Sequence, residues 1–214
     1  MIPILLGHRG ARANTEIQEN SIASFDLALQ HGCDGFEFDV RKSLDGEAVI
    51  CHDPKWRGRT ISKTRAALLD LPTLQNVVRL YSRRAFLDIE LKVPGVEEQT
   101  LSAVRVHAPT KGYVISSFIG AVLRRIALVD SQAALGIICG NHSQLRVWRD
   151  LPVQYVIAEK KLVTRKLVWE VHEAGKRIMV WTVNRASGMK RFAEYGLDGI
   201  ISDETKRLVA TLEE

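Results

Sequence analysis

Eight short apolar runs alternate along the chain with amphipathic stretches, and this alternation constrains the fold more than any other feature. The runs occupy residues 2–7, 35–40, 85–91, 113–116, 134–139, 154–158, 177–183 and 198–202. Apolar residues recur at helical spacing in stretches between them, at 22–30, 73–81, 96–104, 120–128, 143–148, 165–175 and 187–196. Strict strand–helix alternation predicts a parallel sheet covered by helices, and eight repeats can close it into a (β/α)₈ TIM barrel of the α/β class.

A further strand-like segment, EAVIC, breaks the alternation because too few residues precede it for a crossover helix. The Asp45-Gly46 pair just before it is a strong hairpin turn signal. Residues 41–51 are therefore predicted to fold back antiparallel from the end of the second strand. A turn centred between Asp45 and Gly46 puts His52 opposite Asp39, within one or two residues, and so returns this histidine to the carboxylates of the second strand.

The length of 214 residues fits one domain spanning residues 1–214. Hydrophobic residues make up 46% and charged residues 26%, both near the average for globular proteins, so a disordered or fibrous chain is not indicated. The net charge of +5 is spread along the chain, which favours anionic ligands only weakly and fits a solvated surface equally well. Because the basic residues form no stripe with interleaved aromatic residues, nucleic-acid binding is not expected.

The cysteines Cys33, Cys51 and Cys139 lie far apart and are odd in number, which argues against a disulfide framework and a thiolate metal cluster. A reducing compartment fits this pattern. The N-terminal segment lacks the basic residues of a secretory signal, and nowhere do about 18 apolar residues run together. We therefore expect a cytoplasmic protein without a membrane span.

Polar residues end several of the predicted strands. In a βα barrel the active site lies at the carboxyl ends of the strands, so these are the residues to examine for function. They are His8 and Arg9, Glu37 and Asp39, Glu90 and Lys92, Ser116 and Ser117, and Trp181 with Asn184.

Glu37 and Asp39 are two residues apart, so on a strand both side chains point to one face. Two unpaired carboxylates in a core would be costly, and a hard divalent cation with Glu90 as a third ligand removes that cost. The alternative is that structural salt bridges to Arg9, Arg41 or Lys92 neutralise these acids. The spacing alone leaves both interpretations open.

An ordered set of motifs adds to this pattern. It comprises HRG at 8–10, ENS at 19–21, GCDGFEFDV at 32–40, DG at 45–46, HD at 52–53, LPTL at 71–74, ELK at 90–92 and WTVN at 181–184. This set resembles the glycerophosphodiester phosphodiesterase family, with its H-R-G, P-E-N-T, G-x-D-x-x-E-x-D-V, H-D and E-x-K motifs. The similarity extends from His8 to Asp203, nearly the whole chain.

The resemblance implies a phosphoric diester hydrolase that converts glycerophosphodiesters to an alcohol and sn-glycerol 3-phosphate. Glu37, Asp39 and Glu90 would hold one divalent cation, Mg²⁺ or Ca²⁺, against a phosphate oxygen. Arg9 and Lys92 would place positive charge around the phosphate, Arg9 through paired hydrogen bonds and Lys92 as a point charge.

The resemblance also implies that His8 and His52 transfer the protons, because imidazole titrates near pH 6.5 and serves as acid or base at neutral pH. We assign His8 as the base and His52 as the acid, with the reverse order left open. In the family the attacking group is thought to be the neighbouring glycerol hydroxyl, which gives a cyclic phosphate. The chain then needs no covalent nucleophile of its own.

Three further residues receive supporting roles. Glu19 and Asn20 match the family's E-N pair, and Glu19 is expected to position the HRG segment by hydrogen bonding. An N-cap of the first helix is an equally good interpretation for Asn20. Trp181 is expected to pack on the carbons of the substrate, with a place at the rim of the core as its alternative. Ser116, Ser117 and Asn184 are expected to line the site.

The chain departs from the family pattern in two places. Gln18 replaces the proline before E-N. The insertion that many members carry after the H-D motif is reduced here, within about 41–71, to a short basic segment at residues 54–71. An open site beside these basic residues would admit larger substrates, and Trp56 would then contact acyl chains. A plain solvated loop is the other interpretation.

Three alternatives follow. The same residues fit a lysophospholipase D that acts on lysophospholipids. A non-catalytic barrel that binds phosphate is disfavoured because binding alone needs no pair of proton-transfer groups. A phosphate-binding isomerase barrel would need a glycine-rich loop, for which residues 184–188 are a poor match. We expect a small-molecule phosphodiester as the partner, and the oligomeric state stays open.

Overall fold

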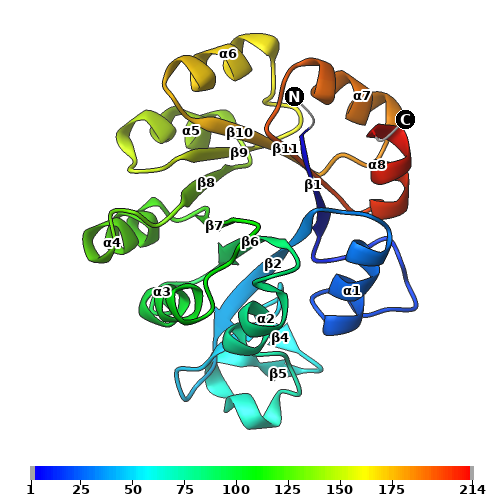
Figure 1. The fold of residues 1–214 in the computed structure, drawn as a ribbon. Helices are drawn as coiled ribbons and strands as arrows, with labels where there is room; N and C mark the ends of the chain where they lie inside the picture. Colours follow the sequence, from blue (N-terminus) through cyan, green and yellow to red (C-terminus); the bar gives the residue numbers. More distant parts are fainter. Residues whose placement is uncertain (1–2, 213–214) are drawn as a thin grey trace.

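The computed structural model describes residues 3–212, which form a closed barrel of parallel strands surrounded by helices (Figure 1). The strands of the barrel are β1 Ile4–His8, β2 Gly35–Lys42, β6 Phe86–Leu91, β7 Tyr113–Ser117, β8 Leu135–Cys139, β9 Tyr155–Glu159, β10 Arg177–Trp181 and β11 Gly199–Ser202. They follow one another in chain order around the barrel, and β1 closes it by pairing with both β2 and β11. The predicted TIM barrel is confirmed.

Helices cover the outside of the barrel. They are α1 Ile22–Gln30, α2 Leu74–Tyr81, α3 Glu97–Val106, α4 Gly120–Val129, α5 His142–Leu145, α6 Arg165–Glu173, α7 Ala186–Glu194 and α8 Thr205–Leu212. At the N-caps of α1, α2, α5 and α6 a side-chain oxygen accepts a hydrogen bond from a backbone N–H group of the first turn. These caps stabilise the N-terminal ends of the four helices. The predicted helix at 143–148 is instead a short α5 followed by the 3₁₀ turn Arg146–Asp150. The sequence interpretation missed α8, in which Leu208 and Val209 are buried.

The predicted hairpin is present, with a register that differs by one residue. The strand β3, Ala48–Ile50, runs antiparallel to β2 and pairs Ile50 with Val40. The loop contains three residues and not two, because the N–H of Ser43 donates to the carbonyl of Glu47 and Gly46 takes a positive φ of 86°. The centre of the hairpin therefore moves onto the residue before Gly46, and Cys51 lies opposite Asp39 where His52 was expected.

A small cap follows the hairpin. It contains the paired strands β4 Lys55–Trp56 and β5 Arg59–Thr60, and the 3₁₀ turns Ile61–Lys63 and Ala66–Leu68. Trp56 packs against a separate buried cluster that includes Val49, Ile61 and Leu69. This half-buried tryptophan therefore lies against a cluster that the hairpin and the cap share.

The main core lies between the strands and the helices, and a second cluster fills the inside of the barrel. The second cluster contains Leu6, Phe86, Val114, Ile138, Tyr155, Ile157, Met179 and Ile201. Bulky side chains thus close the lower part of the barrel, so a ligand can enter only at the carboxyl ends of the strands. Within residues 3–212 no helix combines the length and apolar character needed to cross a membrane.

Candidate active site

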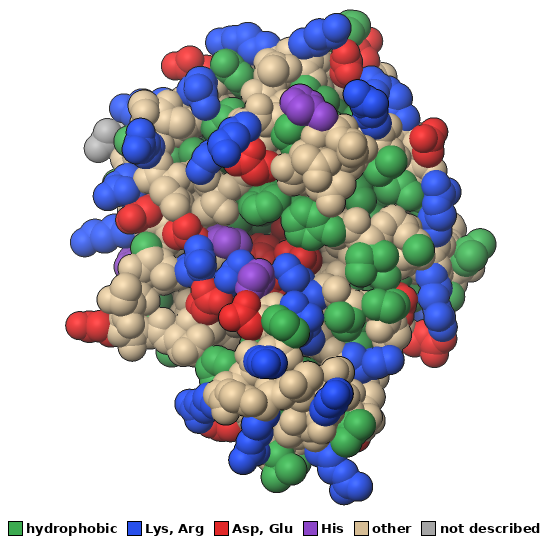
Figure 2. All heavy atoms as spheres, turned by 180° about the vertical axis from the view of Figure 1, so that it is seen from behind, with side chains coloured by type: hydrophobic (Ala, Val, Ile, Leu, Met, Phe, Trp, Pro, Cys, Tyr) green, Lys and Arg blue, Asp and Glu red, His purple; other side chains and the backbone are tan. Residues whose placement is uncertain are grey.

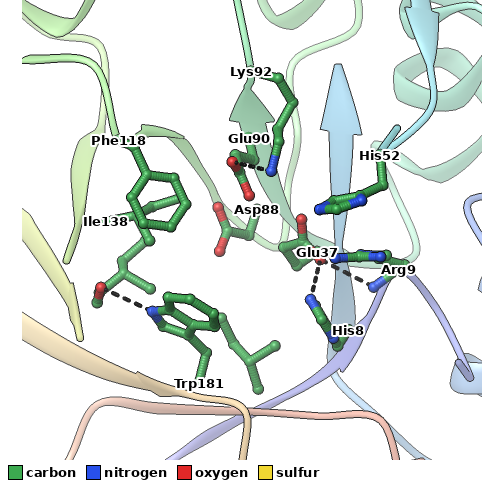
Figure 3. A pocket seen from close by; sticks show the side chains of 12 residues that line it. His8, Arg9, Glu37, His52, Asp88, Glu90, Lys92, Phe118, Ile138 and Trp181 are labelled. Carbon is green, nitrogen blue, oxygen red and sulfur yellow. Dashed lines mark hydrogen bonds and ion pairs between the residues drawn. The ribbon is translucent and has the colours of Figure 1, made fainter. Parts of the chain in front are cut away.

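The carboxyl ends of the strands bring the predicted chemical residues to one cavity of about 130 Å³ (Figure 3). It is lined by His8, Arg9, Glu37, His52, Asp88, Glu90, Lys92, Phe118, Ile138, Ile157, Trp181 and Ile201. Figure 2 shows acidic and histidine side chains gathered in a hollow near the centre of the face it presents. The cavity has a charged side and an apolar side.

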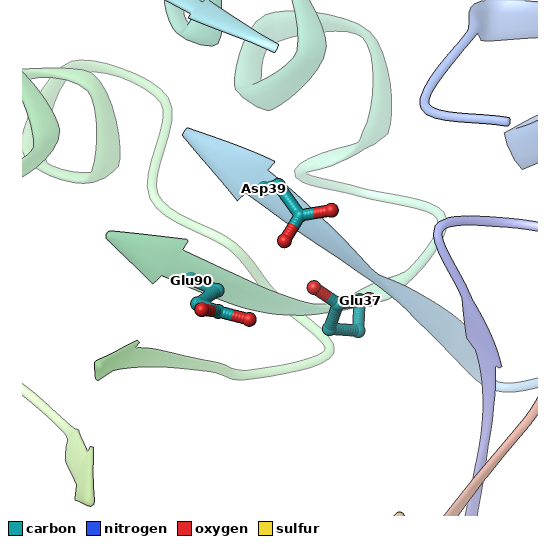
Figure 4. A group of neighbouring side chains, drawn as sticks. All are labelled: Glu37, Asp39 and Glu90. Atoms are coloured by element: carbon teal, nitrogen blue, oxygen red, sulfur yellow. The ribbon is translucent and has the colours of Figure 1, made fainter. Parts of the chain in front are cut away.

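The charged side contains three carboxylates that fit a cation. One oxygen from each of Glu37, Asp39 and Glu90 lies within 4.8 Å of the others, and all three residues are buried (Figure 4). The strand pairing explains this arrangement, because Asp39 on β2 is the direct partner of Glu90 on β6. Glu37 Oε1 is buried without a hydrogen-bond partner in residues 3–212, as expected for an atom whose partner is an ion. The donor set, all carboxylate oxygen, suits Mg²⁺ or Ca²⁺.

The crowding of these acids shifts their pKa values. Burial raises the pKa of Glu37 well above its ordinary value, and the charges of Asp39 and Glu90 raise it further. The pKa of Glu90 rises to about 7 through burial and the charge of Asp39. Burial also acts to raise the pKa of Asp39, but Lys92 and Arg9 outweigh it, so this pKa lies below its ordinary value. Of the three carboxyl groups, Asp39 therefore loses its proton most readily.

Two cations lie beside the acids. Lys92 Nζ is 2.8 Å from Glu90 Oε1 and 3.3 Å from Asp39 Oδ1. Arg9 Nε is 3.2 Å from Asp39 Oδ2, and the Arg9 backbone N–H donates to Glu37 Oε2. The salt-bridge interpretation is therefore correct for Arg9 and Lys92. It is wrong for Arg41, whose Nε donates to the backbone carbonyl of His52. Glu37 Oε1 has no hydrogen-bond partner among the described residues.

The two histidines are each held by a carboxylate at Nδ1. His8 Nδ1 is 2.7 Å from Asp203 Oδ1, and His52 Nδ1 is 2.8 Å from Asp53 Oδ1. A carboxylate only accepts, so Nδ1 carries the hydrogen in both rings and Nε2 is left for the cavity. His8 Nε2 lies 3.8 Å from Glu37 Oε2, near the carboxylate group.

The groups that surround His8 and His52 differ. Burial lowers the pKa of His52, while the charge of Asp39 acts to raise it and that of Arg9 acts to lower it. Burial acts to raise the pKa of Asp203, but its hydrogen bonds with His8 and Asn184 hold this pKa well below the ordinary value. The carboxylate beside His8 therefore stays charged throughout the neutral range.

Glu19 and Asn20 contact the charged side from behind. Glu19 accepts hydrogen bonds from Arg9 Nη1 at 2.9 Å and from Arg12 Nε. Asn20 is buried, and its amide donates to Asp39 Oδ2 at 2.8 Å. The N-cap of α1 is Ser21, so the capping interpretation of Asn20 is wrong. Both side chains fix the orientation of charged groups in the cavity.

The sequence profile of the Glycerophosphoryl diester phosphodiesterase family matches residues 8–94 and 62–207 of the chain. The chain belongs to this family. The predicted resemblance is confirmed, and so is the class of enzyme, because members are phosphoric diester hydrolases. The glycerophosphodiester phosphodiesterase of Caldanaerobacter subterraneus is 29% identical, over 98% of this chain and 97% of that protein.

Solved structures share the fold of this family member. The structure of an Oleispira antarctica phosphodiesterase in complex with the product sn-glycerol-3-phosphate has a TM-score of 0.85 and 24% identity, over 100% of this chain and 98% of that one. The glycerophosphodiester phosphodiesterase from Thermotoga maritima has a TM-score of 0.83 and 23% identity, over 98% of both chains. The barrel of this chain is thus the barrel of the family.

The apolar side of the cavity contains Trp181, whose ring meets Phe118 edge to face at 5.8 Å between centroids. Trp181 Nε1 donates to the backbone carbonyl of Ile157, which fixes the ring at the mouth. Ser116 and Ser117, expected to line the site, are fully buried and do not. Their hydroxyls bind Asp88 Oδ1 and the carbonyl of Leu91.

Sequence reasoning missed several residues of this site, among them Asp203, Asp88 and Phe118. Asp203 follows the last strand, so the rule used for the other strand ends would have found it. Asp88 lies two residues before Glu90 and shares its face of β6, a period-two signal that was available. Phe118 is an apolar residue in a loop and carried no signal. Asn184, expected as a liner, instead binds Asp203 Oδ2 at 2.7 Å.

Proposed function

We propose that the chain hydrolyses glycerophosphodiesters to an alcohol and sn-glycerol 3-phosphate with the help of one divalent cation, Mg²⁺ or Ca²⁺. In a member of this family, two carboxylate-held imidazoles line one cavity together with Glu37 and Glu90, and Asp39 lies beside these two acids. This observation carries the proposal. Binding alone would require no second proton-transfer group. The Oleispira relative with sn-glycerol-3-phosphate gives further support for this product.

The carboxylates Glu37, Asp39 and Glu90 would hold the cation. Two observations support this role: Glu37 Oε1 has no hydrogen-bond partner in the described part of the chain, and the donor set is all oxygen. When bound there, a divalent cation offsets the negative charge that develops on the phosphate oxygens. Arg9 and Lys92 lie at the same edge and would bind phosphate oxygens, Arg9 through its guanidinium hydrogens and Lys92 through its ammonium. Both side chains line the cavity.

The two histidines would move the protons. His8 Nε2 accepts the proton of the attacking hydroxyl as its oxygen bonds to phosphorus, and Asp203 stabilises the imidazolium that forms. His52 donates a proton to the alcohol oxygen as the bond from phosphorus to that oxygen breaks. With a neighbouring glycerol hydroxyl as the attacking group, the product is a cyclic phosphate that water opens with the roles reversed.

The cap gives little support to a lysophospholipid substrate. Trp56 packs against the buried cluster of Val49, Ile61 and Leu69, and the cavity of about 130 Å³ is small. We therefore propose a small diester as the substrate. We also propose that residues 1–214 form a single domain and that the protein is cytoplasmic.

The test is to incubate the purified chain with glycerophosphocholine and, separately, lysophosphatidylcholine, each with Mg²⁺, Ca²⁺ or EDTA, and to identify products by phosphorus NMR. We expect sn-glycerol 3-phosphate from glycerophosphocholine with metal and none with EDTA. The variant Glu37→Gln should lose this activity, and the exposed control Glu173→Gln should keep it. Product formation at the same rate in EDTA, or preferred turnover of the lipid, would overturn the proposal.

A further inference from the structure

Asp88 is a buried carboxyl group at the cavity, and it has no role in the proposed reaction. It is 1% exposed and lies on β6, beside Glu37 of β2. Its Oδ1 accepts a hydrogen bond from Ser116 Oγ at 2.5 Å. Its Oδ2 is buried without a hydrogen-bond partner in residues 3–212. A buried polar atom without a partner costs free energy, so a ligand that supplies one is favoured at this position.

The surroundings of Asp88 indicate what kind of ligand this is. Asp88 does not belong to the group of carboxylates that approach one another within 4.8 Å. In Figure 3 its carboxyl group points toward the apolar side of the cavity, where Phe118 and Trp181 lie. Three isoleucines complete that side: Ile138, Ile157 and Ile201. A short carbon chain fits against these side chains, and Asp88 offers it one polar partner.

A hydroxyl group suits Asp88 better than other polar groups. It donates to a carboxylate and also accepts from a protonated carboxyl, so it binds Oδ2 in either state. An ester or an acyl chain at the same place has no hydrogen to donate to Oδ2. An additional anion would be repelled by the neighbouring acids.

We propose that Asp88 Oδ2 binds the free terminal hydroxyl of the glycerol moiety, so that the enzyme selects phosphodiesters of polyols against deoxy and 1-acyl analogues. This rests on the proposed function and adds a residue that determines specificity. The glycerol carbons then lie on the apolar side, and the phosphate faces the histidines and the acids. The alcohol that leaves extends toward solvent.

The experiment compares glycerophosphocholine with its 1-deoxy analogue, which keeps the hydroxyl next to the phosphate-bearing carbon. We expect the wild type to prefer glycerophosphocholine by at least about 100-fold in kcat/KM, because sites built to bind a hydroxyl reject analogues without it. The near-isosteric Asp88→Leu should bring this ratio to about one. The matched control Ser116→Ala, which alters the buried contact of Asp88 outside the cavity, should retain the preference.

Two outcomes overturn the inference: a wild type that turns over both substrates alike, or an Asp88→Leu variant that keeps the wild-type ratio. If Asp88→Leu does not fold, the wild-type ratio still decides. If the wild type hydrolyses neither diester, the proposed function fails instead. In that case calorimetry with sn-glycerol 3-phosphate and its 1-deoxy analogue still tests Asp88, because only the former should bind tightly and equal affinities would contradict the role.

Discussion

Asp203 Oδ1 lies 2.7 Å from Nδ1 of His8, although the two residues are 195 positions apart in the chain. The closing of the barrel between β1 and β11 makes this contact possible, because Gly7 is the partner of Ser202 across that seam. Asn184 and Arg12 also bind Asp203, at 2.7 Å and 3.2 Å. The carboxylate is therefore fixed in place and keeps Nε2 of His8 directed to the cavity.

Replacing Asp203 by Asn should lower kcat on glycerophosphocholine by about 100-fold or more, because an amide at this position no longer requires the hydrogen at Nδ1. The effect on KM should be small. A matched control is Asp198→Asn, since Asp198 Oδ2 lies 2.8 Å from His172 Nε2 in a pair outside the cavity. Equal losses in the two variants would assign Asp203 a merely structural role.

Asp203 should also contribute to stability in acid. Its folded pKa is depressed, so its contribution is present above the unfolded value near 3.9 and is lost as the pH falls toward the folded value. In that window the unfolded chain takes up a proton that the folded chain does not. We expect the free energy of unfolding of the wild type to fall more steeply from pH 5 to pH 3 than that of Asp203→Asn, by up to about 1.4 kcal/mol per pH unit. Urea titrations at several pH values measure both slopes, and parallel slopes would refute this.

Metal affinity should depend on pH. The pKa of Glu90 is raised to about 7 and that of Glu37 is also raised, and a cation binds only the deprotonated carboxylates. Between pH 8 and pH 6 we expect the affinity to fall, approaching about tenfold per pH unit for each proton released. Calorimetry in buffers of different ionisation enthalpy would detect the protons. An affinity that is constant over this range would contradict the coupling of these acids to the ion.

One glycine of the barrel should tolerate no side chain. A Cβ on Gly35 would lie 1.9 Å from the carbonyl oxygen of Phe86 on the neighbouring strand. Gly35→Ala must push β2 and β6 apart and should cost about 3 kcal/mol or more. In Gly46→Ala the added carbon meets nothing within 4 Å. The free energy of unfolding should then fall by only about 1 kcal/mol, because alanine disfavours the positive φ at this position. Denaturant unfolding compares them, and a similar loss in both would show that the close approach is not the cause.

The strands and most helices could be predicted in order because each is marked in the sequence by its own pattern of buried apolar residues. The hairpin register was off by one residue because the strands are joined by three loop residues, a property of backbone hydrogen bonds near Gly46 that the Asp45-Gly46 signal does not distinguish. The short helix α8 was missed because only a narrow apolar stripe around Leu208 and Val209 marks it.

For the site, residues such as Glu37 and Glu90 could be named because they lie on predicted strands and match motifs. The hydrogen-bond partners of the site residues could not be predicted. The bonds of Asp203 with His8 and of Asn20 with Asp39 form only where separate elements meet in space. Likewise, only the three-dimensional structure shows that Asp88 Oδ2 is buried without a hydrogen-bond partner in residues 3–212.

The most direct test of the account is the rate of glycerophosphocholine hydrolysis, with metal present, by His8→Ala, His52→Ala and the control His107→Ala. His107 is the C-cap of α3 and does not line the cavity. We predict that each cavity variant loses about 10²–10⁴-fold in kcat while the control stays near the wild type. Full activity in either cavity variant would contradict acid–base catalysis by this pair of histidines.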